Sequence, residues 1–173
     1  MASLATLAAD LGEVLKTRNL KLALAESCTG GMVAQMVTSV AGSSAWFDRG
    51  FVTYSNEAKI EMLGVRAETI EKFGAVSEET AKEMALGCLK ASVLKPSAFK
   101  YSHAQVAGSI TGIAGPDGGS KEKPVGTVCF AWVGDKLMLS TTTKRFFGNR
   151  EELRQQAAIA LMAGLIERLK LTA

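Results

Sequence analysis

The chain has 173 residues, 47% of them hydrophobic and 21% charged, which fits one domain over residues 1–173 with a sizeable core. Its 20 Lys and Arg against 17 Asp and Glu leave a net charge of only +3, and no basic run adjoins an aromatic ladder. Nucleic acid and membrane are therefore not indicated as partners. A single histidine, His103, excludes a metal site with several histidine ligands. Three cysteines, Cys28, Cys88 and Cys129, lack CxxC spacing, so we expect a reducing cytoplasm rather than disulfides or a zinc knuckle.

The first part of the chain predicts a helix, a strand and a second helix. Residues 1–12 have no basic segment or long apolar run, so no signal peptide is expected, and no stretch is expected to span a bilayer. Apolar residues at helical spacing from Leu4 to Leu15 indicate an amphipathic helix. A short apolar run at 21–25 then predicts a strand, residues 26–31 a tight turn, and residues 32–40 a helix.

The middle of the chain predicts a second strand followed by two helices. Residues 50–55 are rich in aromatic and β-branched side chains, which favour a strand. Asn56 is expected to cap the helix that contains Lys59, and Ser77 to begin a longer helix reaching about residue 94. Residues 96–103 read as a loop.

The last part predicts a strand at 104–110, a glycine-rich loop and a hairpin. Residues 125–133 and 137–146 flank Gly134-Asp135, a typical hairpin signal. Asn149 and Glu152 form an N-cap and N3 pair ahead of a long terminal helix. Strands that alternate with helices and end in a hairpin predict a three-layer α/β/α sandwich with a mixed sheet.

The turn at 25–31, Ala-Glu-Ser-Cys-Thr-Gly-Gly, is the first candidate site. It places the Ser27 hydroxyl at the carboxyl end of a strand and Thr29, Gly30 and Gly31 at the start of a helix, where free N–H groups favour an anion or an oxyanion. The alternative is that Ser27 or Thr29 simply caps the helix. Cys28 is a rival nucleophile, but without a histidine beside it a small buried hydrophobe is the better interpretation.

Lys59, in the segment Tyr54-Ser55-Asn56-Glu57-Ala58-Lys59, is the second candidate. An amine that is buried near the positive end of a helix has a lowered pKa, so Lys59 could accept a serine proton, with Tyr54 relaying or orienting it. Taken alone, without Ser27, the segment fits better a solvated helix lysine and a half-buried strand tyrosine.

Two further segments supply polar groups. The loop from Thr111 and Gly112 to Gly119 fits neither GxxxxGK nor GxGxxG, yet it could line a site for a small polar ligand; the alternative is an ordinary long turn. Arg150 lies just inside a helix start and could receive a phosphate, or it could be a surface arginine.

Together these segments resemble the C-terminal domain of the CinA competence and damage-inducible family. The resemblance covers nearly the whole chain and rests on AESCTGG at 25–31, AGSSAWFDRGFVTYSNEAK at 41–59, GAVSEE at 74–79, TGIAGPDGG at 111–119, KPVGTV at 123–128 and FGNREELR at 147–154. It is similar to a stand-alone form of the domain. The segment 94–105 is longer than the family's usual link between helix and strand.

The resemblance implies an amidohydrolase that converts nicotinamide mononucleotide (NMN) to nicotinic acid mononucleotide and ammonia in pyridine-nucleotide salvage. It implies Ser27 as nucleophile, Lys59 as base, Tyr54 as supporting hydroxyl, and Thr111 and Arg150 as further polar residues. No metal or other cofactor is expected. The protein is expected to be a homodimer in the cytoplasm. Two alternatives stay open: a catalytically silent interaction domain in competence or DNA-damage response, and a serine-lysine amidase with another substrate.

Overall fold

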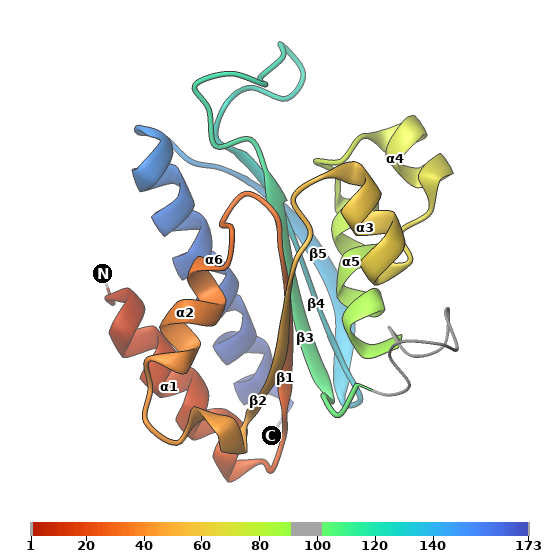
Figure 1. Ribbon diagram of the computed structural model, residues 1–173. Helices are drawn as coiled ribbons and strands as arrows, with labels where there is room; N and C mark the ends of the chain where they lie inside the picture. The colour runs from red at the N-terminus through yellow and green to blue at the C-terminus, as the bar shows by residue number, and fades with distance from the viewer. Residues whose placement is uncertain (1, 91–101, 173) are drawn as a thin grey trace.

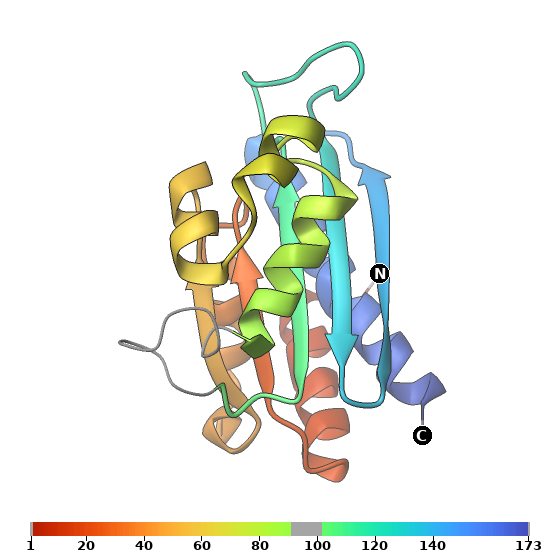
Figure 2. The same cartoon turned by 90° about the vertical axis from the view of Figure 1, so that its right-hand side faces the viewer.

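A computed structural model describes residues 2–90 and 102–172, and it contains a five-stranded mixed sheet between two layers of helices (Figure 1). The strand order is β2-β1-β3-β4-β5. The first three strands run parallel, while β4 is antiparallel to β3 and β5 to β4 (Figure 2). The strands are β1 (Leu22–Glu26), β2 (Phe47–Val52), β3 (Val106–Gly112), β4 (Thr127–Gly134) and β5 (Leu137–Arg145).

One face of the sheet carries α1, α2 and α6, and the other carries α3, α4 and α5 (Figure 1). This confirms the predicted sandwich of two helical layers around a mixed sheet. The helices are α1 (Leu4–Thr17), α2 (Met32–Thr38), α3 (Asn56–Leu63), α4 (Ala67–Phe73), α5 (Glu78–Lys90) and α6 (Arg150–Leu171), with a short 3-10 turn, η1 (Ser43–Ala45), before β2.

Alternating side chains of the central strands feed two separate hydrophobic cores, as a pleated strand requires. In β1, Leu22 and Leu24 pack toward α1, α2 and α6, while Ala23 and Ala25 pack toward α5. The α5 side is lined largely by small residues, so this helix can lie close to the sheet. The part of the chain that the structure describes contains no helix long and apolar enough to cross a membrane.

Several predicted boundaries were wrong. Strand β2 starts at Phe47 rather than residue 50, and α3 is capped by Ser55, whose hydroxyl accepts the Ala58 N–H at 3.0 Å, rather than by Asn56. The hairpin turn lies at residues 135–136, one position later than predicted, because Gly134 is still paired with Leu137.

Other differences concern whole elements. Helix α4 was not predicted, and β3 extends through Thr111 and Gly112. The predicted end of α5 near residue 94 and most of the 96–103 loop lie outside the described residues. The capping box of Asn149 and Glu152 is confirmed.

Candidate active site

The candidate site lies at the carboxyl ends of β1 and β3, the neighbouring parallel strands at the centre of the sheet. From the carboxyl end of β1 the chain continues into α2 and back to β2, whereas from the carboxyl end of β3 it continues through residues 113–126 to β4 on the other side, so the connections diverge at this point. In open α/β sheets such a divergence leaves a crevice where ligands bind. Ser27 occupies it directly after β1, and its N–H donates to Ile110 O at 3.0 Å.

Ser27 and Lys59 are brought together across 32 positions of sequence. The Lys59 Nζ lies 3.0 Å from the Ser27 Oγ, and the lysine is 1% exposed although its side chain is charged in its ordinary state. A long cationic side chain is rarely buried this fully without a carboxylate partner. Here the other partners of Nζ are backbone carbonyls, Thr53 O at 2.9 Å and Tyr54 O at 3.3 Å among them.

This arrangement suits a neutral amine. Burial lowers the pKa of Lys59 below its ordinary value. A neutral amine has two N–H donors and one lone pair, so the donors can be satisfied by the Thr53 and Tyr54 carbonyls while the lone pair faces the Ser27 hydroxyl. Ser27 and Lys59 are thus a candidate nucleophile and a candidate general base, close enough for proton transfer.

Cys28 and His103 do not compete for these roles. Burial raises the pKa of the Cys28 thiol to about 12, so the thiolate is scarce near neutral pH. His103 is exposed and precedes the amino end of β3, whereas Ser27 lies at the carboxyl end of the sheet's parallel strands.

The turn after Ser27 is held by a buried carboxylate, and this changes part of the predicted site. Glu26 is 1% exposed and accepts hydrogen bonds from the Thr29 hydroxyl and from the N–H groups of Gly31, Val33 and Ala34. The start of α2 is thus already occupied by an anion of the protein itself. Thr29, Gly30 and Gly31, predicted to bind substrate, are absent from the described lining of the cavity, and the Thr29 hydroxyl and the Gly31 N–H are bound to Glu26.

Two amides of the turn remain available. The Gly30 N–H donates to Ser27 O at 3.0 Å and the Gly31 N–H to Glu26, but the Cys28 and Thr29 N–H groups have no acceptor among the described residues. They directly follow Ser27, where an oxyanion formed on attack by its Oγ would need donors.

A cavity of about 250 Å³ opens over Ser27 and Lys59. Gly112 and Thr111 form part of its wall, and a Cβ on Gly112 would come within 3.1 Å of the Cys28 Sγ. The Thr111 hydroxyl donates to Ala75 O at 2.8 Å, so only its lone pairs are free for a ligand.

Arg150 and Tyr54 meet at the rim of this cavity. The Arg150 guanidinium donates to the Tyr54 hydroxyl at 2.9 Å and to Gly115 O at 2.7 Å. Within the described residues, the Tyr54 hydroxyl makes no hydrogen bond to Ser27 or Lys59; it is the Tyr54 carbonyl that contacts Lys59. Asp117 also lines the cavity and is the one acidic side chain among its described lining residues.

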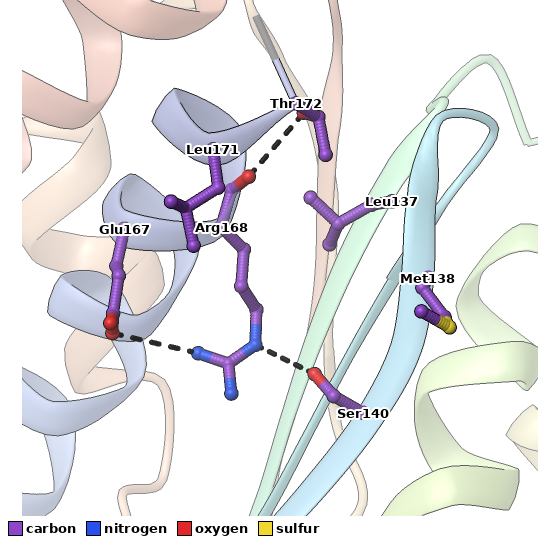
Figure 3. Close-up of a pocket in the computed structure, with 7 residues that line it drawn as sticks. All are labelled: Leu137, Met138, Ser140, Glu167, Arg168, Leu171 and Thr172. Carbon is purple, nitrogen blue, oxygen red and sulfur yellow. Dashed lines mark hydrogen bonds and ion pairs between the residues drawn. The ribbon is translucent and has the colours of Figure 1, made fainter.

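A second cavity, of about 300 Å³, lies between the start of β5 and the end of α6 (Figure 3). There Arg168 donates to the Ser140 hydroxyl at 2.6 Å. The Arg168 Cζ also lies 3.8 Å from the centroid of the Trp132 ring. No serine-lysine pair occurs among its described lining residues, so it offers no comparable chemistry.

Three residues at the site were missed from the sequence: Glu26, Asp117 and Arg154. Glu26 and Asp117 lie inside the motifs already singled out, next to Ser27 and in the glycine-rich loop. Arg154 lies one helical turn after Arg150, and this i,i+4 spacing was the available signal. Across residues 2–90 and 102–172, no group of three or more His, Cys, Asp or Glu side chains could hold a metal ion.

The fold and this geometry define an α/β domain with a buried serine-lysine pair at the carboxyl ends of its parallel strands. Residues 4–169 match the family model of the CinA C-terminal domain. The chain belongs to this family.

Named relatives agree with the assignment. The nicotinamide-nucleotide amidohydrolase PncC of Enterobacter agglomerans is 51% identical over 165 residues, covering 95% of this chain and 94% of that protein. PncC of Escherichia coli K12 is 52% identical over 156 residues, covering 90% and 88%. Both names denote hydrolases that act on an amide.

Solved structures of the family share the whole fold. A CinA superfamily protein from Klebsiella pneumoniae 700603 superposes with a TM-score of 0.88 at 38% identity, covering 98% of this chain and 99% of that one. The competence/damage-inducible protein CihA from Agrobacterium tumefaciens gives a TM-score of 0.82 at 40% identity, covering 99% and 94%.

Proposed function

We propose that this protein hydrolyses the carboxamide of NMN, yielding nicotinic acid mononucleotide and ammonia. The observation that carries the proposal is the buried Lys59 amine 3.0 Å from the Ser27 hydroxyl, in a chain about half identical to named nicotinamide-nucleotide amidohydrolases. The reaction needs a nucleophile, a base and an oxyanion site, and the cavity offers a candidate for each.

In the acylation half, the neutral Lys59 amine takes the Ser27 proton as the Oγ attacks the carboxamide carbon. The carbonyl oxygen becomes an oxyanion, which the Cys28 and Thr29 N–H groups would hold. Lys59 then returns the proton to the leaving nitrogen, the C–N bond breaks, and ammonia departs. An acyl ester on Ser27 remains.

In the deacylation half, Lys59 is again neutral and takes a proton from a water molecule that attacks the ester. The ester C–O bond breaks, the proton returns to the Ser27 Oγ, and the carboxylic acid product leaves. The chain's own groups thus carry every proton, and we expect a chelator to leave turnover unchanged.

Charge at the cavity supports a nucleotide of this kind. NMN carries a cationic pyridinium ring and an anionic phosphate. Asp117 lines the cavity with no ion pair among the described residues, and Arg150 adds a guanidinium at the rim. We propose that Asp117 favours the ring and Arg150 the phosphate.

The test is turnover by purified protein, measured as ammonia release and as nicotinic acid mononucleotide by chromatography. NMN, nicotinamide riboside, free nicotinamide and a short peptide amide are compared, with Ser27→Ala as the blank. We expect hydrolysis of NMN that Ser27→Ala abolishes. Arg150→Ala should lower turnover of NMN more than that of the riboside. Preference for the peptide amide, or equal activity in Ser27→Ala, would overturn the proposal.

We further propose that the protein works in the cytoplasm as a homodimer. Three cysteines, all buried, are unpaired, which suits a reducing compartment. Light scattering on the purified protein tests the dimer, and a monomeric mass at working concentration contradicts it.

A further inference from the structure

We propose that Arg154 is a positioning residue for the reaction: its guanidinium holds the carbonyls of Cys28 and Thr29 and so fixes the turn after Ser27 with the Cys28 and Thr29 N–H groups facing the oxyanion. The inference rests on the proposed function and concerns rate rather than substrate binding. Arg154 lies on α6, and it is absent from the described lining of the cavity, so it acts through the turn.

The contacts are specific to the turn. The Arg154 Nε donates to Cys28 O at 3.1 Å and its Nη2 donates to Thr29 O at 3.0 Å. One guanidinium thus holds two successive carbonyls, a fork that a single ammonium point charge does not reproduce.

Peptide planarity transmits this hold to the amides. In a trans peptide the C=O and the N–H point in opposite directions. Fixing Cys28 O on Arg154 therefore turns the Thr29 N–H away from α6. Fixing Thr29 O turns the next amide, Gly30 N–H, away from α6 as well, and this N–H is found on Ser27 O at 3.0 Å. That bond in turn directs the Cys28 N–H away from Gly30.

The turn is consequently held from two sides. Glu26 accepts the N–H groups of Gly31, Val33 and Ala34, and Arg154 donates to the Cys28 and Thr29 carbonyls, the second of which also accepts the Met32 N–H. The two amides left without an acceptor among the described residues are those of Cys28 and Thr29. Preorganised donors of this kind need no rearrangement when the oxyanion forms.

Charge adds to the effect. Arg154 forms no ion pair with a described carboxylate, and its hydrogen bonds there go to neutral carbonyls. Its positive charge lies beside the turn where negative charge would develop, and there it opposes the negative charge of the buried Glu26 carboxylate on the same turn.

The experiment compares Arg154→Met and Arg154→Lys with the control Arg168→Met. Arg168 also lies on α6, but it contacts Trp132 and Ser140 by the second cavity. With NMN as substrate, we expect Arg154→Met to lower kcat by about 30- to 100-fold with KM within threefold, since a lost oxyanion donor costs about 10²- to 10³-fold. Arg154→Lys keeps the charge without the fork and should recover only part of the rate. Arg168→Met should keep kcat.

Two further readouts separate positioning from mere stability. Added guanidinium ion at millimolar concentration should raise kcat of Arg154→Ala but not of Arg168→Met. Labelling of Ser27 by a fluorophosphonate, whose phosphoryl oxygen takes the place of the oxyanion, should slow in Arg154→Met by a similar factor, whatever the natural substrate.

The outcomes are distinct. A wild-type protein that labels at Ser27 but does not hydrolyse NMN overturns the proposed function, while slow labelling of Arg154→Met still supports the role of Arg154. Wild-type turnover of NMN with unchanged kcat in folded Arg154→Met overturns the inference alone. A loss of rate that matches the unfolded fraction, with no rescue by guanidinium, also overturns it.

Discussion

In the proposed mechanism Lys59 has to lose its proton before it can accept one from Ser27, and its burial favours that loss. The amine is 1% exposed and is surrounded by neutral carbonyls and a hydroxyl, so burial lowers its pKa from an ordinary value of about 10.4. The same carbonyls hold the nitrogen beside Ser27. Position and basicity thus come from one set of contacts.

The pH dependence of turnover follows from this pKa. Because only the neutral amine accepts a proton, the rate should rise as pH increases through the lowered pKa of Lys59 and level off above it. Lys59→Arg should nearly silence the enzyme, since a guanidinium stays protonated.

His103→Ala serves as the control, because with a histidine as base the rate would instead rise with pH near the ordinary histidine pKa of about 6.5. His103 is exposed and lies away from Ser27, so the pH profile of ammonia release should be unchanged in this variant. Substantial activity in Lys59→Arg, or a limb that vanishes with His103, contradicts the assignment.

Thr53, beside the same lysine, has a buried hydroxyl that lowers the stability of the fold. It is fully buried, and its hydroxyl oxygen has no hydrogen-bond partner among the described residues, while its backbone carbonyl holds Lys59. An unpaired buried hydroxyl costs about 1–3 kcal/mol. Thr53→Val keeps the shape and removes the hydroxyl, so the free energy of unfolding should stay level or rise by about 1 kcal/mol.

Thr80→Val is the matched control for this prediction. Thr80 is equally buried, but its hydroxyl donates to Gly74 O at 2.8 Å, so its loss should lower stability by about 1–2 kcal/mol. Urea denaturation measures both variants. An equal loss in the two would mean that the Thr53 hydroxyl is paired in solution.

At the scale of elements, α2 depends on Glu26 at its start. This helix has only seven residues, and Glu26 accepts two of its early N–H groups, that of its N-cap residue Gly31, and the Thr29 hydroxyl. Glu26→Gln puts an NH₂ group against N–H donors, and hydrogen bonds to a charged group are worth about 1.5–3 kcal/mol. We expect the free energy of unfolding to fall by about 2 kcal/mol or more.

The comparison is Glu13→Gln, which changes an exposed glutamate paired with Lys16 on the surface of α1. Such pairs contribute about 0–1 kcal/mol, so this variant should unfold at nearly the wild-type urea concentration. A small loss in Glu26→Gln, similar to that of Glu13→Gln, would show that α2 does not need the buried carboxylate.

Glu26 also marks what sequence patterns could and could not predict. Hydrophobic periodicity and capping residues are visible in short stretches of sequence, so they predicted β1, the hairpin, the α6 capping box and the order of layers. They also singled out Ser27 and Lys59, since each follows a strand. A motif does not say which partner a side chain contacts. The start of α2 was therefore assigned to substrate although Glu26 binds its N–H groups, and the hydrogen bonds of Arg154 to the turn were missed. Helix α4 is seven residues long and carries a single buried residue, Thr69, too little for a hydrophobic pattern.

At the scale of the whole molecule, the site joins the two helical layers. The Ser27 turn is held by Arg154 of α6 on one side of the sheet, while Lys59 comes from α3 on the other (Figure 1). The distance between Oγ and Nζ therefore depends on how closely α3 packs on α5. Gly87 of α5 sets that packing, since a Cβ there would overlap the carbonyl oxygen and the Cβ of Leu63 at the end of α3.

Gly87→Ala should consequently lower both the free energy of unfolding and kcat. Overpacking costs about 1–3 kcal/mol, and because Leu63 must move, α3 and its Lys59 should move with it. A displacement of about 1 Å at a reacting group can cost about 10²-fold in rate. We expect kcat per folded molecule to fall at least about tenfold.

Gly12→Ala is the control, since its Cβ would come within 2.7 Å of Trp46 in the other core, away from Lys59. It should lose similar stability yet keep its kcat. Measuring ammonia release from NMN at a temperature where thermal melts show both variants folded decides the matter: equal kcat in the two would mean that α3 holds Lys59 in place independently of α5.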